Sequence, residues 1–397
     1  MNQLNVFYLG DRVGALAEAR GGIVFEYAPE FLASRHELSP LALPLGPGLR
    51  SRDQPPSGRL HGLFADSLPD SWGTRVMNDW FSARGVHEFD VSALMRLAYI
   101  GDRGFGALSY APSTEVLSKE SNLAELYHAA LSVAAGNPID LDRLAAVGSS
   151  AGGARPKVAI WISTTTGDLT AGPAQSDSAA WLVKFDTSAD HMHGKMEYAY
   201  SLMCCAAGIA FPDTRLLRTD HDDGPRMHFA IRRFDRIGTE RVHYQSLAGM
   251  CQVMGGDLDY ATFLRVTRNI SADYTEVLKA FRRAVFNVLA GNRDDHGKNH
   301  GFLYRDRQWR LSPAFDVTFT SRSRLPERGM AIRGERAMAD SKNLTALANA
   351  EGIEKNDATK IFDEVRAAIE QWPQFASAAG LKEELSAAIK REILTTR

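Results

Sequence analysis

The sequence has few cysteines, almost no net charge and no long apolar segment. Its three cysteines, Cys204, Cys205 and Cys251, cannot form a disulfide framework, and none lies in a Cys-x-x-Cys pair. The formal net charge of −2 gives no overall electrostatic reason to bind nucleic acid or a membrane surface, although a local basic patch is compatible with it. No segment approaches about 18 uninterrupted apolar residues, so we expect no membrane-spanning helix.

The start of the chain, MNQLNVFYLGDR, lacks a basic region followed by an apolar stretch. We therefore expect no signal peptide and a cytoplasmic location. The length of 397 residues suits roughly two to three domains of about 150 residues each. With 44% hydrophobic residues, such a chain can bury a large core without disulfides or metal ions.

The N-terminal third begins with strand-like segments. Residues 5–9 and 13–16 are short apolar runs on either side of Gly10-Asp11-Arg12, a pattern that predicts a β-hairpin. Residues 39–58 are rich in Pro, Gly and Ser, which predicts a long loop. The glycine-rich segment 101–106 is not part of a βαβ unit, so we interpret it as a tight turn and not as a nucleotide-binding loop.

Helical patterning follows at about 70–97 and again at 121–135. The second stretch ends before Gly136 and Pro138, which are typical helix-stop signals. We place the first domain boundary close to this point.

The remainder of the chain changes from strands to helices. Runs of β-branched and aromatic residues predict strands at 158–162, 181–185 and 229–231. After about residue 245 the pattern becomes helical, most clearly over 277–289, where Gly291 supplies the C-terminal stop, and again over 361–372. A strand-rich segment followed by a helix-rich one is the order of a two-lobed kinase.

The segment Asn292–Asn299, NRDDHGKN, carries the sharpest chemical signal. Protein kinases place a catalytic Asp and a Mg²⁺-binding Asn five residues apart in the pattern R-D-x-x-x-x-N. Arg293, Asp294 and Asn299 reproduce this spacing directly after a predicted helix. One short loop can then point a carboxylate at the acceptor hydroxyl and an amide oxygen at the metal. The alternative interpretation is a charged turn formed by residues 294–296.

A predicted hairpin connects this loop to a second carboxylate. Residues 302–304 and 309–311 should pair as strands, which would bring Asp316 back toward Asn299. Amide and carboxylate oxygens are ligands suited to Mg²⁺, whose other ligands are water and phosphate oxygens. We therefore predict that Asn299 and Asp316 bind one Mg²⁺ ion.

Two upstream features suit phosphate binding. Residues 148–154 form a loop of small residues, in which backbone N–H groups can approach an anion closely. It is not a Walker A loop, because Val158 follows Lys157 where Ser or Thr would be required. Lys184 lies between apolar residues of a predicted strand, where a charge needs a partner, and Glu197 on the following helix is the candidate.

These motifs together resemble the HipA-type serine/threonine kinases, toxins of bacterial type II toxin–antitoxin pairs. The similarity rests on SSAGGARPKVAI, WLVKFD, IRRFDR, DDHGKNHGFLY and LSPAFDV, which occur in the family's order. LFADSLPDSWG and YIGDRGFGAL are similar to the family's N-terminal region, so the resemblance spans essentially the whole chain.

The resemblance implies roles for individual residues. Asp294 would be the catalytic base, Asn299 and Asp316 the Mg²⁺ ligands, and Glu197 the ion-pair partner of Lys184. Ser150 would be the autophosphorylated residue, with Ser149 as the alternative. Arg232 departs from the acidic or apolar residue expected at the hinge. The residues expected to bind ATP are Ser150, Ala151, Gly152, Gly153, Ala154, Lys157, Lys184, Arg232, Arg233, Phe234, Asp235, His296 and Lys298.

We therefore expect an α+β, bilobal protein-kinase-like fold, with an N-terminal subdomain at 1–139, a strand-rich lobe at 140–244 and an all-helical lobe at 245–397. The implied cofactors are ATP and Mg²⁺. The implied partners are a small helix-turn-helix antitoxin, operator DNA bound through it, and an aminoacyl-tRNA synthetase as substrate, typically the glutamate enzyme. Alternative functions are phosphotransfer to a small molecule or lipid, and a co-repressor module bound to a DNA-binding antitoxin.

Overall fold

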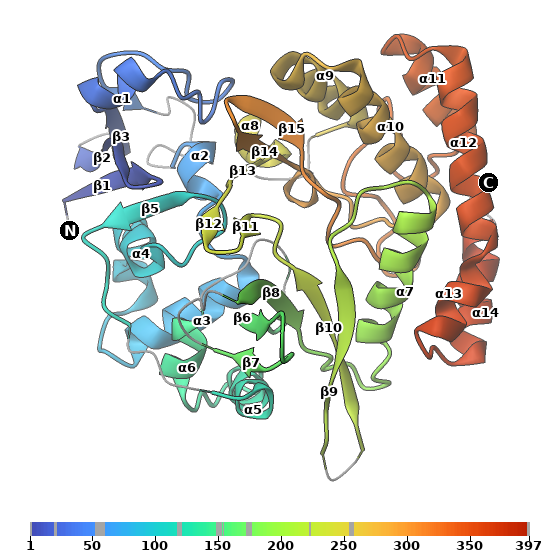
Figure 1. The fold of residues 1–397 in the computed structure, drawn as a ribbon, viewed down its shortest axis with the longest axis horizontal. Coiled ribbons are helices and arrows are strands. Elements are labelled where there is room, and N and C mark those ends of the chain that lie inside the picture. The colour runs from blue at the N-terminus through green and yellow to red at the C-terminus, as the bar shows by residue number, and fades with distance from the viewer. Residues whose placement is uncertain are drawn as a thin grey trace.

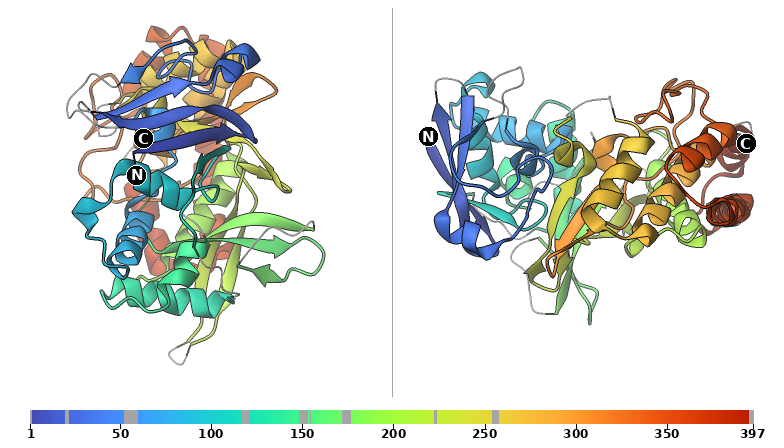
Figure 2. Two further views of the ribbon diagram at one scale, coloured as in Figure 1. Left: turned by 90° about the vertical axis from the view of Figure 1, so that its left-hand side faces the viewer. Right: turned by 90° about the horizontal axis from the view of Figure 1, so that it is seen from above.

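The protein is described by a computed structural model over residues 2–19, 22–51, 60–116, 121–147, 153, 155–171, 177–221, 224–253 and 258–394. The described part of the chain contains two five-stranded antiparallel sheets, a two-stranded and a three-stranded sheet, helices packed beside the large sheets, and a group of C-terminal helices. Figure 1 shows the N-terminal sheet on the left, the second sheet in the lower centre and the C-terminal helices on the right. The view from above in Figure 2 shows the same order.

The first sheet forms the core of an N-terminal module. Its strand order is β4-β3-β2-β1-β5, and the predicted hairpin is confirmed as β1 paired with β2. The strands are β1 Gln3–Tyr8, β2 Asp11–Ala19, β3 Gly22–Tyr27, β4 Arg50–Ser51 and β5 Leu108–Ala111. The helices of the module are α1 Pro29–Ser34, α2 Gly62–Ala65, α3 Ser71–Ser82, η1 Glu88–Asp90 and α4 Ala93–Ile100. Gly10 has a φ of +96°, which suits the tight β1–β2 turn.

The second sheet has the strand order β7-β6-β8-β10-β9. Its strands are β6 Lys157–Ser163, β7 Leu169–Thr170, β8 Ser178–Lys184, β9 Thr214–Thr219 and β10 Arg226–Arg232, so the three predicted strands are confirmed. Helix α7, His193–Ala206, packs against β9 and β10. Helix α5, Leu123–Ala134, and α6, Leu141–Ala146, share a core with β6 and β8. The predicted boundary at 139 stays a prediction, although α5 packs with the second sheet.

The C-terminal part is mainly helical. Its helices are α8 Leu247–Met250, α9 Tyr260–Ser271, α10 Tyr274–Leu289, η2 Gly297–Asn299, α11 Ser341–Ala350, α12 Lys355–Glu370, α13 Trp372–Ala378 and α14 Glu383–Leu394. Helix α10 ends where predicted, with Gly291 at a φ of +70°. No helix in the described part of the chain combines the length and apolarity that a bilayer crossing requires.

The class of the fold is as predicted, an α+β kinase-like architecture, but one detail differs. The segment expected to be all helical also contains the predicted hairpin, β14 Gly301–Arg305 and β15 Gln308–Leu311. Strand β13, His243–Ser246, joins them as a three-stranded sheet and crosses the predicted boundary at 244. The pair β11, Arg236–Ile237, and β12, Glu240–Arg241, lies just before it.

The N-terminal module contacts the C-terminal part through two glycines. A Cβ atom on Gly62 of α2 would lie 1.9 Å from the carbonyl oxygen of Gly249 on α8. A Cβ atom on Gly249 would lie 2.1 Å from Asp66 Oδ2. Asp66 in turn accepts hydrogen bonds from the backbone N–H of Ser246 at 2.7 Å and from its hydroxyl at 2.8 Å. The two parts therefore approach at backbone distance.

A buried ion cluster makes the contact with the second sheet. The carboxylate of Asp235 is fully buried and accepts from the Arg233 guanidinium at 2.7 Å, from Arg236 at 2.5 Å and from Gly106 N–H at 2.8 Å. Arg233 and Arg236 also donate to the carbonyl of Gly104. The segment 101–106 is thus a tight turn of the N-terminal module, held by this cluster.

Removal of the central carboxylate should destabilise the fold. We expect Asp235→Ala to lower the free energy of unfolding by about 3–5 kcal/mol, because two buried guanidiniums would lose their counter-ion. Asp213→Ala, which removes the exposed partner of Arg232, should cost at most about 1 kcal/mol. Chemical denaturation at neutral pH measures both, and equal effects would contradict the assignment.

The same cluster predicts a pH dependence. Burial alone would raise the pKa of Asp235, but Arg233 and Arg236 hold it below the usual value. Because the pKa of Asp235 is depressed in the folded state, the stability that ionised Asp235 contributes to folding is fully present at neutral pH. This stability is lost as the pH falls through the pKa of the folded state.

Candidate active site

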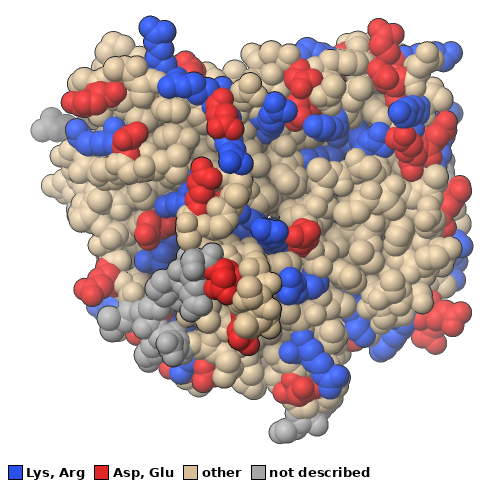
Figure 3. All heavy atoms as spheres, viewed as in Figure 1, with Lys and Arg blue, Asp and Glu red and all other residues tan. Residues whose placement is uncertain are grey.

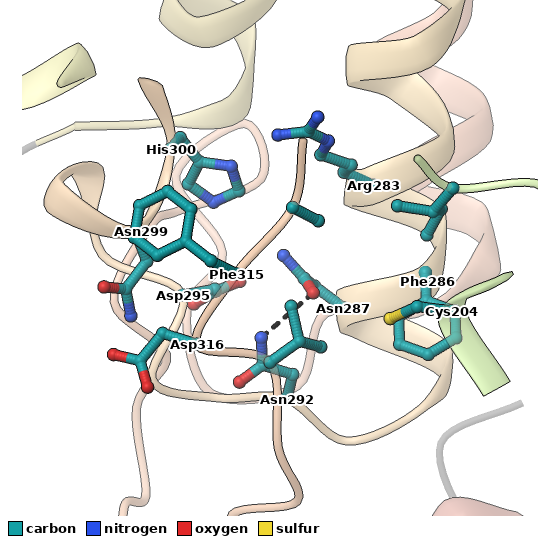
Figure 4. A pocket seen from close by; sticks show the side chains of 13 residues that line it. Cys204, Arg283, Phe286, Asn287, Asn292, Asp295, Asn299, His300, Phe315 and Asp316 are labelled. Atoms are coloured by element: carbon teal, nitrogen blue, oxygen red, sulfur yellow. Dashed lines mark hydrogen bonds between the residues drawn. The ribbon is translucent and has the colours of Figure 1, made fainter. Parts of the chain in front are cut away.

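The predicted catalytic loop follows α10 and is fixed to it by side-chain hydrogen bonds. Asn292 donates from Nδ2 to Asn287 Oδ1 at 3.0 Å, the contact drawn in Figure 4. Asn287 donates to the hydroxyl oxygen of Tyr260 at 2.9 Å, which links the loop to α9. The loop therefore starts from a rigid helix end.

Asp295 anchors the loop from within. Its side chain is fully buried and accepts from the Tyr260 hydroxyl at 2.6 Å, from Arg328 Nη1 at 2.6 Å and from the backbone N–H of Gly329 at 2.9 Å. The interpretation of residues 294–296 as a solvated charged turn therefore fails for Asp295. The sequence analysis did not assign it a role, and its partners lie about 30 or more residues away, beyond any local pattern.

Asp294, the neighbouring carboxylate, points outward instead. Its side chain is 58% exposed, and its Oδ1 lies 3.7 Å from His296 Nε2. Desolvation by the surrounding protein raises the pKa of Asp294, the negative charge of Asp316 raises it further, and His296 opposes both. The result is an accessible carboxylate that accepts a proton more readily than an ordinary aspartate.

The two predicted Mg²⁺ ligands meet in the structure. Figure 4 shows the side chains of Asn299 and Asp316 next to each other. Asn299 donates from Nδ2 to the carbonyl of Asp294 at 2.8 Å, and its buried Oδ1 has no hydrogen-bond partner among the described residues. Asp316 has a φ of +54°, an unusual conformation of the kind that functional sites often contain. An orphaned amide oxygen beside a carboxylate fits a hard cation such as Mg²⁺.

The ion pair predicted for Lys184 is also present. Lys184 Nζ contacts Glu197 of α7 and lies 2.5 Å from Asp316 Oδ1. Burial alone would lower the pKa of Lys184, but Asp316 and Glu197 raise it above the usual value. Burial would likewise raise the pKa of Asp316, whereas Lys184 and Lys157 lower it strongly. Both groups are therefore charged at neutral pH.

Lys157 lies opposite Lys184 on the neighbouring strand and has a different partner. The register of β6 and β8 pairs these two lysines directly. Lys157 Nζ forms an ion pair with Asp70, the N-cap of α3, and donates to the carbonyl of Gly153 at 2.9 Å. Asp70 comes from the N-terminal module, 87 residues away in sequence, so no motif spacing could have identified it.

Most of the predicted phosphate loop lies outside the described residues. This applies to Ser149, Ser150, Ala151, Gly152 and Ala154, so their predicted roles stay predictions. Gly153 is described, and it lies at the site. Its φ is +91°, and a Cβ atom there would lie 2.9 Å from Lys157 Nζ and 3.9 Å from Asp316 Oδ2.

The side chains of the predicted hinge residues, 232–235, lie in different surroundings. The side chains of Arg233 and Asp235 belong to the buried cluster facing the N-terminal module, and exposed Arg232 pairs with Asp213. The structure does not bring these three side chains to the Lys184–Asp316 centre. Phe234 does approach it, because its ring lies 5.5 Å from that of Phe315. Adenine contacts in this segment stay a prediction.

A cleft of about 270 Å³ opens beside Asp294. The N-terminal module contributes Asp66 and Asp70 to its wall, and the catalytic loop contributes His296 and Lys298. His296 and Lys298, which the family resemblance implies as ATP-binding residues, line this cleft together with Asp294.

Two family descriptions match the chain in order. The HipA N-terminal domain matches residues 4–111, and the HipA-like C-terminal domain matches residues 149–372. Two similar curated proteins come from Sinorhizobium fredii, and their names describe both as candidate kinases. Y4mE is 26% identical over 344 residues, which are 80% of this chain and 77% of that protein. Y4dM is 29% identical over 160 residues, and this match covers 37% of the chain and only 39% of Y4dM.

A solved structure shares the fold. It is the Shewanella oneidensis MR-1 toxin–antitoxin complex of HipA, HipB and its operator DNA, with a TM-score of 0.72 at 16% sequence identity. The superposition covers 99% of this chain and 96% of that chain. The C-terminal domain description alone matches more than half of the sequence. The chain therefore belongs to the HipA family.

Proposed function

We propose that this protein is an ATP- and Mg²⁺-dependent serine/threonine protein kinase. The arrangement of Lys184, Asp316 and Asn299 around one point, with Asp294 facing an adjacent cleft, is the observation that supports it. A buried, charged lysine suits phosphate oxygens, and the unpartnered amide oxygen suits a metal. The candidate-kinase names of the Sinorhizobium proteins agree with this proposal.

In the proposed reaction, an acceptor hydroxyl in the cleft lies against the carboxylate of Asp294. The hydroxyl oxygen forms a bond to the γ-phosphorus of ATP while the bond between that phosphorus and the bridging oxygen of ADP breaks. The hydroxyl proton passes to Asp294, whose raised pKa makes it a better acceptor. Lys184, oriented by Glu197, would hold the phosphates. Mg²⁺, when held by Asn299 and Asp316, would neutralise phosphate charge.

Asp294→Asn tests the base. We expect phosphotransfer to fall by at least about 100-fold, because general base catalysis contributes about 10²–10⁴-fold. ATP affinity should stay nearly unchanged, since the side chain faces the acceptor. Radiolabel transfer and calorimetry measure the two quantities. In the wild type, activity should decline as the pH drops through the raised pKa of Asp294.

The matched control is Asp306→Asn in the exposed turn between β14 and β15, where the side chain is 88% exposed. It should behave like the wild type. Comparable activity in the Asp294 and Asp306 variants would refute the assignment of the base.

Asp316→Ala tests the metal. Loss of this carboxylate should weaken the binding of Mg²⁺–ATP and reduce activity together, since both depend on the same ligand. Metal-free ATP should bind with much smaller change, because Lys184 would remain paired with Glu197. Calorimetry with and without Mg²⁺ separates these effects. An unchanged Mg²⁺–ATP affinity would show that Asp316 is not a ligand.

We also propose autophosphorylation at Ser150 as an off-switch. A phosphoserine carries about −1.5 to −2 charges at neutral pH and would repel ATP from a loop that cradles phosphates. After incubation with Mg²⁺–ATP, peptide mapping should locate one phosphate at Ser150, and the modified protein should bind ATP poorly. Ser149→Ala should still be modified and Ser150→Ala should not. The opposite pattern would transfer the role to Ser149.

The biological role follows from the family and remains part of the proposal. The Shewanella complex contains HipB and operator DNA. By analogy, this chain would be a cytoplasmic toxin, restrained by a small helix-turn-helix antitoxin that attaches it to operator DNA. Its substrate would be an aminoacyl-tRNA synthetase, typically the glutamate enzyme. Phosphoproteomics of cells that express the chain or Asp294→Asn would identify the acceptor and distinguish a protein from a small molecule or lipid.

A further inference from the structure

A second cleft, of about 410 Å³, lies away from the Lys184–Asp316 centre. It opens between the N-terminal module, which contributes Asp102 and Arg103, and the second sheet with the segment that follows it. Ala180 marks its edge on β8, four residues from Lys184, or roughly 13 Å along the strand. The proposed phosphotransfer chemistry assigns no role to this cleft.

One wall of the cleft consists of four arginines, Arg103, Arg233, Arg236 and Arg241. Two carboxylates oppose them. Asp235 lies fully buried and binds Arg233 and Arg236, and Asp102 lies on the rim. Among the described residues named here, four positive charges face two negative ones, which is an excess of two positive charges.

Arg103 and Arg241 carry this excess. No carboxylate lies within 4 Å of either guanidinium in the part of the chain that the structure describes. Within the described residues, Arg241 donates to two backbone carbonyls, those of Gly106 at 3.1 Å and Leu108 at 2.7 Å. Arg103 donates to the carbonyl of Tyr99 and lies over its ring. Carbonyl oxygens satisfy hydrogen-bond donors but leave the charge uncompensated.

The pKa values of these arginines reflect the unfavourable burial of their positive charges. The pKa of Arg236 is lowered to about 9, mainly by burial and also by the positive charges of Arg233 and Arg241, although Asp235 opposes this shift. Burial also lowers the pKa of Arg103 and of Arg241. Arg233, Arg236 and Arg241 all anchor the segment 104–108 through its carbonyl groups, but these carbonyls supply no negative charge that would offset Arg103 and Arg241.

The lining of the cleft also includes the apolar residues Ile160, Trp161 and Val116. A ligand that fills the cleft therefore needs an anionic group at one end and an apolar body at the other. An excess of two positive charges matches a phosphate monoester, which carries about −1.5 to −2 charges at neutral pH, better than a singly charged carboxylate. Guanidinium groups also suit the geometry of phosphate oxygens.

We propose that this cleft binds the phosphate group of a small phosphate monoester with an apolar or aromatic body, at a site separate from the ATP site. Such a ligand would contact Arg103 of the N-terminal module together with Arg241 beyond the second sheet. It would thereby stabilise the contact between these two parts of the molecule. The inference does not depend on the kinase proposal.

Phenyl phosphate is a suitable probe for the full-length protein. Calorimetry is performed with a saturating non-hydrolysable ATP analogue and Mg²⁺, so that the ATP site is occupied. We expect one binding event, tighter than that of singly charged phenyl sulfate. Inorganic phosphate, which lacks the apolar body, should bind more weakly than phenyl phosphate.

Arg103→Gln should weaken the binding of phenyl phosphate by roughly tenfold or more, because a hydrogen bond to a charged group is lost. Arg241→Gln should do the same, and thermal unfolding shows whether each variant is folded. Arg310→Gln, an exposed arginine on β15, is the matched control and should leave the affinity unchanged. Absent binding, binding abolished by the ATP analogue, or equal affinity in folded Arg103→Gln and wild type would each overturn the proposal.

Discussion

Two buried lysines on adjacent strands are the constraint around which the structure is organised. Lys157 and Lys184 face each other in the register of β6 and β8, and like charges directly opposite are destabilising. Each lysine therefore requires its own carboxylate, and no strand of this sheet supplies one. Asp70 comes from the N-terminal module, Glu197 from α7 and Asp316 from the segment after β15. The carboxylates that neutralise the two lysines therefore come from three parts of the chain and meet at one point. This point is also the candidate phosphate site.

The neighbouring aspartates of the catalytic loop show how environment divides the work between identical side chains. Asp295 is fully buried and holds the loop through Tyr260 and Arg328. Asp294 is exposed beside a cleft and has a raised pKa. The buried residue provides rigidity and the exposed one is available for chemistry. If Asp294 were the buried residue and Asp295 the exposed one, the loop would have the same composition. It would nevertheless lose both its anchor and its accessible carboxylate at this position.

The N-terminal module belongs to the site and is not a separate attachment. It supplies Asp66 and Asp70 to the cleft beside Asp294, and its contact at Gly62 leaves no room for a side chain. Charge is otherwise well mixed, and Figure 3 shows positive and negative side chains interspersed over the visible face. Against this background, the cleft with Arg103 and Arg241 stands out because four arginines line it and Asp102 is the one carboxylate in its described lining.

The sequence by itself determined the local elements and the spacing of the catalytic loop. Periodicity located the first hairpin, three of the five strands of the second sheet and α10 with its stop at Gly291, since these features depend on neighbouring residues. The five-residue separation of Asp294 and Asn299, and the hairpin that returns Asp316, are likewise local. Even the pair of Lys184 and Glu197 follows from one strand and the next helix.

Only the tertiary structure decided which distant residues meet. Asp70 pairs with Lys157 across 87 positions, and Asp295 bonds Arg328 across 33, so neither partnership leaves a pattern in the sequence. The family resemblance implied that the hinge arginines bind ATP, but the side chain of Arg233 turns toward Gly104 of the N-terminal module. Burial fixed these outcomes, because a charge removed from water must find a partner wherever the fold provides one.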